Sequence, residues 1–152
     1  MDEQLLIFEL AEEAYGLAVN QIQTVIPRQT IVPVPNAPAF VAGLINLRGS
    51  IIPVVDLRRR FNMPPSAQAY KSVIIVTVLD GLKTGLLVDS VTEVIRIGAE
   101  AIEPPSALLA NLESAYLRGI GRLADRPIML LDLLQLFASD ERQALARTTL
   151  VA

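Results

Sequence analysis

The chain has 152 residues, of which 52% are hydrophobic and 19% charged, so it can bury a core of ordinary domain size and does not have the composition of a disordered chain. Thirteen Lys and Arg residues stand against sixteen Asp and Glu residues, and this balance argues against nucleic acid or an anionic membrane as the main partner. The absence of His and Cys excludes thiol catalysis, disulfides, histidine acid–base chemistry and the usual kinds of zinc site.

The start of the chain is acidic, with Asp2 and Glu3, and its uninterrupted apolar runs are only several residues long. Signal peptides begin with basic residues, and membrane-spanning helices need about 20 apolar residues. We therefore expect a cytoplasmic protein that does not insert into a membrane.

Ten short runs of β-branched and aliphatic residues, separated by Gly, Pro and Asn about every ten residues, predict strands. In chain order the predicted strands are 5–10, 15–19, 22–26, 43–47, 51–55, 73–79, 84–88, 93–97, 119–123 and 128–131. This number of short strands predicts an all-β barrel or sandwich.

Helical signals are confined to short segments. Residues 107–115 lack Gly and Pro, and residues 139–147 follow a Ser that can cap a C-terminal helix. Asp56 and Asp132 are each expected to cap a single helical turn.

The sequence contains an internal repeat. Residues 15–26 align without gaps on 84–95, and residues 40–61 align on 116–137 at a wider spacing, which places the extra residues in the connection around 98–115. The repeat predicts two similar β units, at about 1–66 and 67–138, followed by a C-terminal helix at about 139–147. Because a unit of this size is marginal alone, we expect the two to pack together as one domain over 1–152.

Three patterns offer catalytic or ligand-binding alternatives. The stretch 119–124 fits the loose Gly-x-Gly-x-x-Ala dinucleotide pattern, but a strand rather than a helix is predicted after it, which favours a β-hairpin. Asp56 and Asp132 could form a carboxylate pair, although their positions favour helix caps. The basic run Arg58-Arg59-Arg60 is typical of a solvated face, with a partner or anion contact as the alternative.

Two features suggest binding to another protein. Arg48 lies at the tip of a predicted hairpin, on a turn that Gly49 permits, where its guanidinium is either an exposed turn charge or a directional contact. Val25 and Ile26 point to opposite faces of one strand, so one face is either an interface between the units or an exposed patch. Composition and spacing alone predict a non-enzymatic protein of two β units, with no catalytic residue, cofactor or metal ion.

Several motifs resemble those of the CheW-like domain family of chemotaxis coupling proteins. They include Asn46-Leu-Arg-Gly49, Pro53-Val-Val-Asp-Leu57, Tyr15-Gly-Leu-Ala-Val19 and Gly85-Leu-Leu-Val-Asp89, and together they cover nearly the whole chain. The resemblance implies two five-stranded SH3-like β-barrel subdomains, in agreement with the repeat.

The family resemblance also implies a function. Such proteins are adaptors that bridge the regulatory domain of the histidine kinase CheA to the cytoplasmic tip of methyl-accepting chemoreceptors, at membrane-associated receptor arrays. It further implies that barrel ends pair into rings, and the internal symmetry would allow the chain to self-associate head to tail.

Carried over by position, the resemblance assigns two sets of residues. The receptor-binding groove would be lined by Ile22, Thr24, Val25, Val88 and Val91. The contact with kinase or receptor would be made by Gly43, Asn46, Arg48 and Gly49. Thr24 stands where family members often carry an acid that could pair with Arg48. This departure either leaves Arg48 free for an acid of a partner or changes the choice of partner.

Two other functions stay open at this stage. One is a coupler of a non-flagellar pathway, such as twitching or gliding motility or developmental signalling. The other is a small hydrolase or ligand-binding barrel, which would need a deep pocket with converging polar groups.

Overall fold

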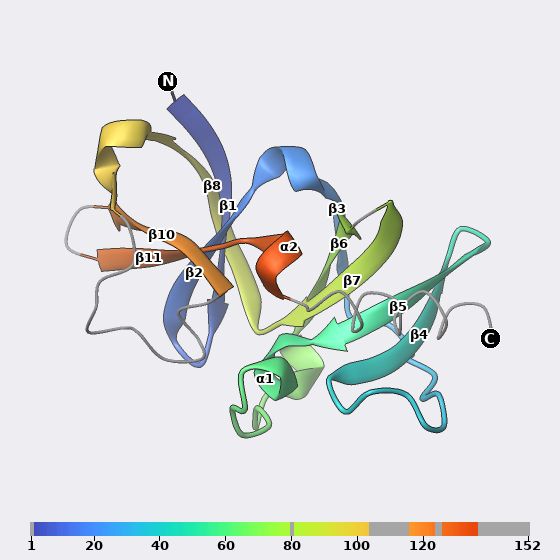
Figure 1. The fold of residues 1–152 in the computed structure, drawn as a ribbon. Helices are drawn as coiled ribbons and strands as arrows, with labels where there is room; N and C mark the ends of the chain where they lie inside the picture. Colours follow the sequence, from blue (N-terminus) through green and yellow to red (C-terminus); the bar gives the residue numbers. More distant parts are fainter. Residues whose placement is uncertain (1, 80, 104–115, 124–125, 137–152) are drawn as a thin grey trace.

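The computed structural model of the chain describes residues 2–79, 81–103, 116–123 and 126–136 (Figure 1). Strands joined by short turns dominate this part. In chain order the elements are β1 Asp2–Leu10, β2 Glu13–Ala18, η1 Val19–Gln21, β3 Ile22–Pro27, β4 Val41–Leu47, β5 Ser50–Asp56, α1 Leu57–Arg60, η2 Ala69–Lys71, β6 Val73–Leu79, β7 Leu82–Val88, β8 Ser90–Gly98, η3 Ala99–Ala101, β9 Ile102–Glu103, β10 Leu117–Leu123, β11 Arg126–Leu131 and α2 Leu133–Leu136.

All ten predicted strands are confirmed, and so is the all-β class. The sequence did not predict β9, because its two residues lie in a turn-rich connection. The expected helices at 107–115 and 139–147 lie outside the described residues.

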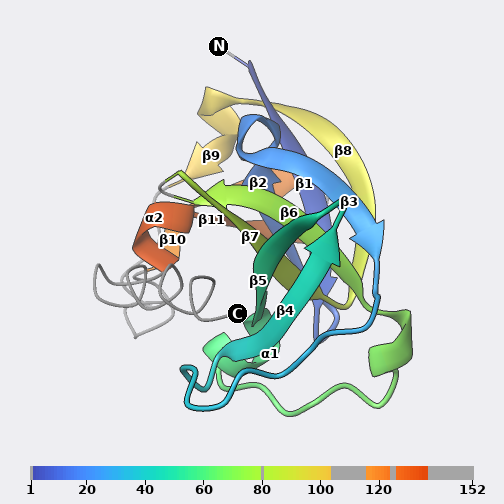
Figure 2. The same cartoon turned by 90° about the vertical axis from the view of Figure 1, so that its right-hand side faces the viewer.

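The strands form two sheets that lie side by side (Figure 1). Sheet A has the order β8-β1-β2-β11-β10-β9, and sheet B has the order β3-β6-β7-β5-β4. In the turned view, sheet B lies in front of sheet A (Figure 2). Sheet A thus has six strands, one more than expected, because β9 pairs with β10 at its edge.

The sheets do not follow the unit boundary expected near residue 66. The hairpin β1–β2 belongs to the first repeat but pairs with β8 and β11 of the second. The hairpin β6–β7 belongs to the second repeat but pairs with β3 and β5 of the first. Each half of the chain therefore gives its first hairpin to the sheet of the other half.

Equivalent parallel pairings attach these exchanged hairpins. In sheet B, Val54 lies opposite Gly85, and in sheet A, Leu130 lies opposite Gly16. The four residues occupy matching positions of the sequence repeat, so the structure has the same internal symmetry as the sequence. All other strand pairs are antiparallel.

Three apolar clusters hold the sheets, because neighbouring residues of a strand point to opposite faces. The A cluster, within sheet A, contains Leu5, Ile7, Ala14, Ile97, Ile128 and Leu130. The B cluster, within sheet B, contains Ile45, Ile52, Val54, Ile74, Val76 and Leu87. The shared cluster includes side chains of both sheets, among them Leu6, Phe8, Leu10, Leu17, Val55, Ile75, Leu86, Val88 and Leu131.

The helix-cap prediction is confirmed at both positions. Asp56 Oδ1 accepts hydrogen bonds from the backbone amides of Arg58 and Arg59, at 3.0 and 3.4 Å. Asp132 Oδ1 accepts from those of Leu134 and Gln135, also at 3.0 and 3.4 Å. The β-hairpin alternative for the glycine pattern is confirmed as well, because Gly119 and Gly121 lie in β10, which pairs with β11.

Gly85 tests the packing of β7 between its two neighbours, because its missing side chain leaves room for Ile74 of β6 and Val54 of β5. A Cβ at this position would lie 2.8 Å from Ile74 Cγ2 and 3.3 Å from Val54 Cγ2, both in the B cluster. Gly85→Ala should therefore lower the free energy of unfolding by about 1–3 kcal/mol, the usual cost of overpacking. Urea unfolding followed by circular dichroism measures the change.

The control is Gly81→Asn, at a turn with φ of 80° where a Cβ meets no atom within 4 Å. Asn tolerates this backbone region, so the control should stay close to the wild type. Equal stability of Gly85→Ala and the wild type would contradict the close packing of β7 against Ile74 of β6 and Val54 of β5.

Candidate protein-interaction surfaces

The β4–β5 hairpin ends in a two-residue turn formed by Arg48 and Gly49. Their φ angles of 53° and 87° are those of a type I′ turn, the favoured connection of tight hairpins. Asn46 Oδ1 accepts a hydrogen bond of 2.9 Å from the Gly49 amide and fixes the turn. The structure thus brings together three of the residues that the sequence assigned to a binding contact.

Arg48 is exposed at this tip and has no hydrogen-bond, ion-pair or ring partner within the described ranges. A left-handed backbone costs a non-glycine residue roughly 1–2 kcal/mol, and strain of this kind is concentrated at functional sites. Arg48 therefore occupies a backbone conformation that disfavours a side chain, and its guanidinium is exposed.

Gly43 is a buried residue of β4 and does not belong to the contact surface. It is buried, with φ of 149°, and a side chain there would collide with the Val32 carbonyl oxygen. Its neighbour Leu44 exchanges two backbone hydrogen bonds of 2.9 Å with Val32. The close backbone approach expected at Gly43 exists, but it is made by the chain's own segment, so the assignment of Gly43 to a partner contact is corrected.

An apolar hollow of about 370 Å³ lies beside the hairpin. Val32 and Ile51 at its rim are 59% and 43% exposed. Its lining is Val32, Pro33, Val34, Pro35, Leu44, Ile45, Asn46 and Ile51. Sequence reasoning missed the hollow because Pro33 and Pro35 appeared only as a connection, although the run of apolar residues between prolines was a usable signal. Asn46 joins the hollow to the hairpin tip.

The residues assigned to a receptor groove lie mainly on β3 and β8, the outer strands of the two sheets. Ile22 and Val91 are half-buried and both pack against the shared cluster. Val25 is 37% exposed and pairs with Ile75 of that cluster. A register shift between Ile22 and Thr24 puts Ile22 and Val25 on one face, although they are three residues apart.

Val94 completes this surface, which we call the β3–β8 face: Ile22, Val25, Val91 and Val94. Val94 is 55% exposed and pairs with Leu6 of the shared cluster, as Val25 pairs with Ile75. Val94 was not among the residues assigned from the sequence, although it aligns with Val25 in the repeat. The turn η1 before β3 contacts both β1 and β6, so β3 begins beside the strand that pairs with β8.

Val88 and Thr24 do not belong to this face. Val88 is only 1% exposed and lies within the shared cluster, so its assignment to a contact surface is corrected. Thr24 pairs with Val76 of the B cluster, on the opposite face of β3 from Val25.

The basic run is not the solvated face that the sequence suggested. Arg59 is exposed and lies 3.5 Å from Asp56. Arg60 Nε donates to the Leu136 carbonyl at 3.0 Å, and its guanidinium lies over the rings of Phe40 and Tyr116. Phe40 and Tyr116 are equivalent in the repeat, so Arg60 ties the two halves together.

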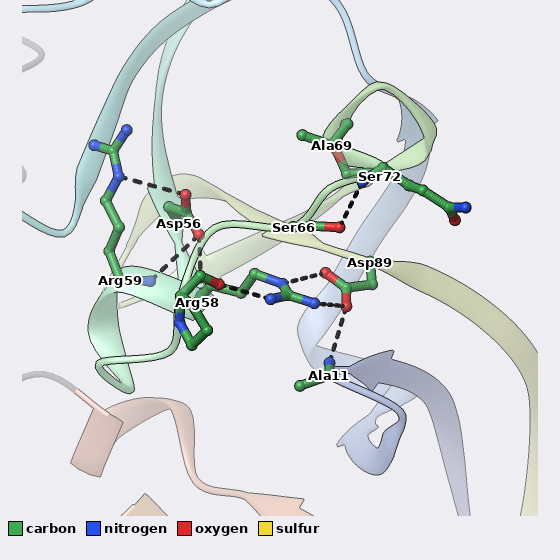
Figure 3. Close-up of polar contacts among 10 residues, drawn as sticks. Ala11, Asp56, Arg58, Arg59, Ser66, Ala69, Ser72 and Asp89 are labelled. Carbon is green, nitrogen blue, oxygen red and sulfur yellow. Dashed lines mark hydrogen bonds and ion pairs between the residues drawn. The ribbon is translucent and has the colours of Figure 1, made fainter.

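Arg58 forms a two-pronged ion pair with Asp89 (Figure 3). Its Nε and Nη2 donate to the two carboxylate oxygens of Asp89 at 2.7 and 2.5 Å, and its Nη1 donates to the Pro64 carbonyl at 2.7 Å. Asp89 Oδ2 also accepts from the Ala11 amide at 2.9 Å. The pair therefore joins α1, the start of β8 and the β1–β2 turn.

The ion pair shifts the pKa values of both Arg58 and Asp89. The hydrogen bond from Arg58 lowers the pKa of Asp89, and the amide of Ala11 lowers it further, while partial burial acts in the opposite direction. The same hydrogen bond raises the pKa of Arg58. Both groups are charged at neutral pH and hold β8 in place beside the β1–β2 turn.

Within the described ranges, no helix is long and apolar enough to span a membrane, and no three His, Cys, Asp or Glu side chains cluster as metal ligands would.

Two β-sheets whose apolar side chains are partly exposed in the described part of the chain are an architecture suited to protein interaction. The chain belongs to the CheW-like domain family, whose sequence profile matches residues 4–141.

Relatives and a solved structure agree with this assignment. The chain is 31% identical to the chemotaxis protein CheW of Treponema pallidum over 147 residues, covering 94% of this chain and 86% of the relative. It is 33% identical to CheW of Klebsiella aerogenes, covering 91% of this chain and 84% of the relative. The crystal structure of the scaffolding protein TtCheW from Thermoanaerobacter tengcongensis matches with a TM-score of 0.84 and 38% identity, over 93% of this chain and 96% of that one.

The Arg58–Asp89 pair makes a prediction about pH. Asp89→Asn should lower the free energy of unfolding at pH 7 by about 1.5–3 kcal/mol, the usual contribution of hydrogen bonds to charged groups. Because the folded-state pKa of Asp89 is lowered, its stabilisation is present above the ordinary value of 3.8 and is lost as the pH falls through the lowered value. The difference from the wild type should thus shrink below about pH 4, as measured by urea unfolding at a series of pH values.

Glu93→Gln serves as the control, since it removes one carboxylate from an exposed side chain that has no ion pair among the described residues. It should change stability by less than about 0.5 kcal/mol. A difference for Asp89→Asn that stays constant from pH 7 to pH 3 would refute the role of charge in this contact.

Proposed function

We propose that the chain is a non-enzymatic adaptor of chemotaxis that couples chemoreceptors to the histidine kinase CheA. Family membership supports the coupling role, and the chain has no histidine that could accept phosphate from the kinase. The observation that supports the proposal is the presence of two separate surfaces that carry exposed apolar side chains among the described residues, the hairpin tip with its hollow and the β3–β8 face.

The hairpin tip and the hollow are proposed to bind the regulatory domain of the kinase. Interfaces of this type combine an apolar centre with a few directional polar contacts, and arginine is enriched among the residues that dominate binding. Val32 and Ile51 would supply the apolar centre, and Arg48 would pair with a carboxylate of the kinase domain. Asn46 and Gly49 would act by holding the turn in shape.

The β3–β8 face is proposed to bind the helical cytoplasmic tip of a chemoreceptor. Four valine and isoleucine side chains in two equivalent pairs offer a narrow apolar strip, which suits the apolar face of an amphipathic helix. The adaptor would then lie in the cytoplasm, in arrays beneath membrane-embedded receptors. The receptor that it binds would also identify the pathway, flagellar or otherwise.

The kinase surface is tested with Arg48→Asp, measured by calorimetric titration against the CheA regulatory domain of the same organism. Loss of a desolvated arginine contact typically costs about 2 kcal/mol or more, so affinity should fall about 30-fold. Lys83→Asp is the matched control, because Lys83 is another exposed cation without a partner in the described part of the chain. Equal affinity of the Arg48→Asp variant and the wild type would overturn this surface.

The receptor surface is tested with Val25→Glu and Val94→Glu, each titrated with a receptor tip fragment. A carboxylate forced into an apolar contact should weaken receptor binding at least about tenfold and leave kinase binding unchanged. Val78→Glu is the control, since Val78 is 47% exposed on β6, away from this face. If only Val78→Glu weakened receptor binding, the assigned face would be wrong.

A further inference from the structure

The β3–β8 face has two halves that are equivalent in the repeat. This equivalence leaves open in which direction a bound helix would lie along the face. Ile22 corresponds to Val91, and Val25 corresponds to Val94. Each pair sits at the same place relative to its sheet, with the same register shift between its two members. An apolar strip with this symmetry would accept a helix in two opposite directions with similar affinity.

The symmetry ends at the next position along each strand. Arg96 follows on β8, and Pro27 occupies the equivalent position on β3. Arg96 pairs across the sheet with Gln4, two residues from the Val94–Leu6 pair, so its side chain leaves β8 on the same face as Val94. Pro27 pairs with Val73. One end of the face therefore carries the Arg96 cation and a polar neighbour, and the other end carries Pro27. Arg28 follows Pro27 but points to the opposite side, where its Nη1 donates to the Ala69 carbonyl and the Ser72 hydroxyl.

Arg96 has nothing to neutralise it within the described part of the chain. Most other cations there are engaged: Arg58 with Asp89, Arg118 with Glu3, Arg122 with Glu103 and Arg126 with Glu9. Arg96, Arg48 and Lys83 make no hydrogen bond, ion pair or ring contact through their side chains among the described residues.

The nearby acids do not compensate Arg96. Glu93 pairs with Ile7 of the A cluster, on the opposite face of β8. Asp2 lies on the same face as Gln4, but it forms no ion pair with Arg96 in the described structure. The guanidinium therefore stays available at one end of the apolar strip.

We propose that Arg96 sets the direction in which the receptor helix lies on the β3–β8 face, by pairing with an acidic side chain of that helix. The occupant is thus an amphipathic helical segment with apolar residues along one side and a Glu or Asp at one end of that side. In the reversed direction the acid would meet Pro27 and lose its charged partner, which selects against that arrangement. This inference rests on the proposed receptor-binding function.

The test uses the full chain and a recombinant chemoreceptor tip fragment from the same organism, with affinity measured by calorimetry. Arg96→Glu should weaken binding about tenfold, and Lys83→Glu, the same charge change away from the face, should not weaken it. Kinase-domain binding should be unchanged in both variants. Conversion of one acidic residue of the fragment to Lys should restore binding to Arg96→Glu and weaken binding to the wild type, as expected for two charges that meet directly.

The outcomes separate this inference from the function on which it rests. If Val94→Glu abolishes binding but Arg96→Glu binds like the wild type, the face is a receptor site and the role of Arg96 is wrong. If Arg96→Glu loses affinity but no acid-to-lysine change restores it, the proposed acid pairing is wrong. If the wild type does not bind the fragment, the receptor-binding function itself fails.

Discussion

The exchange of hairpins between the two halves of the chain is the constraint on which the rest of the structure depends. The parallel pairings of Val54 with Gly85 and of Leu130 with Gly16 seat each hairpin in the sheet of the opposite half. Neither sheet can then form from one half of the sequence alone. The exchanged hairpins join the two halves of the chain by backbone hydrogen bonds within each sheet. Because β1, β2, β6 and β7 also contribute to the shared cluster, apolar packing joins the two sheets. The two sheets thereby set the spacing between the two proposed binding surfaces.

Residues that depart from the internal symmetry carry the specific properties of the chain. Arg58 and Asp89 lock the start of β8, whereas the equivalent positions hold Leu134 and Asn20. Arg60 lies over the equivalent rings of Phe40 and Tyr116, and its own counterpart is Leu136. Arg96 occupies the repeat position that Pro27 occupies in the first half of the chain. Residues shared by the two repeats form the two sheets. Charged residues that have no charged counterpart in the other repeat make the two halves of the chain different from each other.

The sequence predicted local structure well and long-range partnership less well. Alternation, turn residues and the repeat identified ten strands, and Asp56 and Asp132 were identified as caps because a cap depends on neighbouring residues only. The hairpin exchange was not predictable, since equivalent hairpins offer the same apolar pattern to either half. Val88 was misassigned for a related reason: β7 is buried on both faces, so apolar residues there do not reveal which side is exposed. Gly43 was placed at a partner contact because the sequence could not show that the chain itself fills that space.

The central claim is that one rigid frame presents two surfaces that act at the same time. The most direct measurement is the autophosphorylation rate of the kinase, reconstituted with receptors in membrane vesicles, with and without this chain. The account predicts strong receptor-dependent activation only when the chain is present, and loss of that activation when the hairpin tip or the β3–β8 face is disrupted. Kinase activation by receptors that is equal without the chain would contradict it.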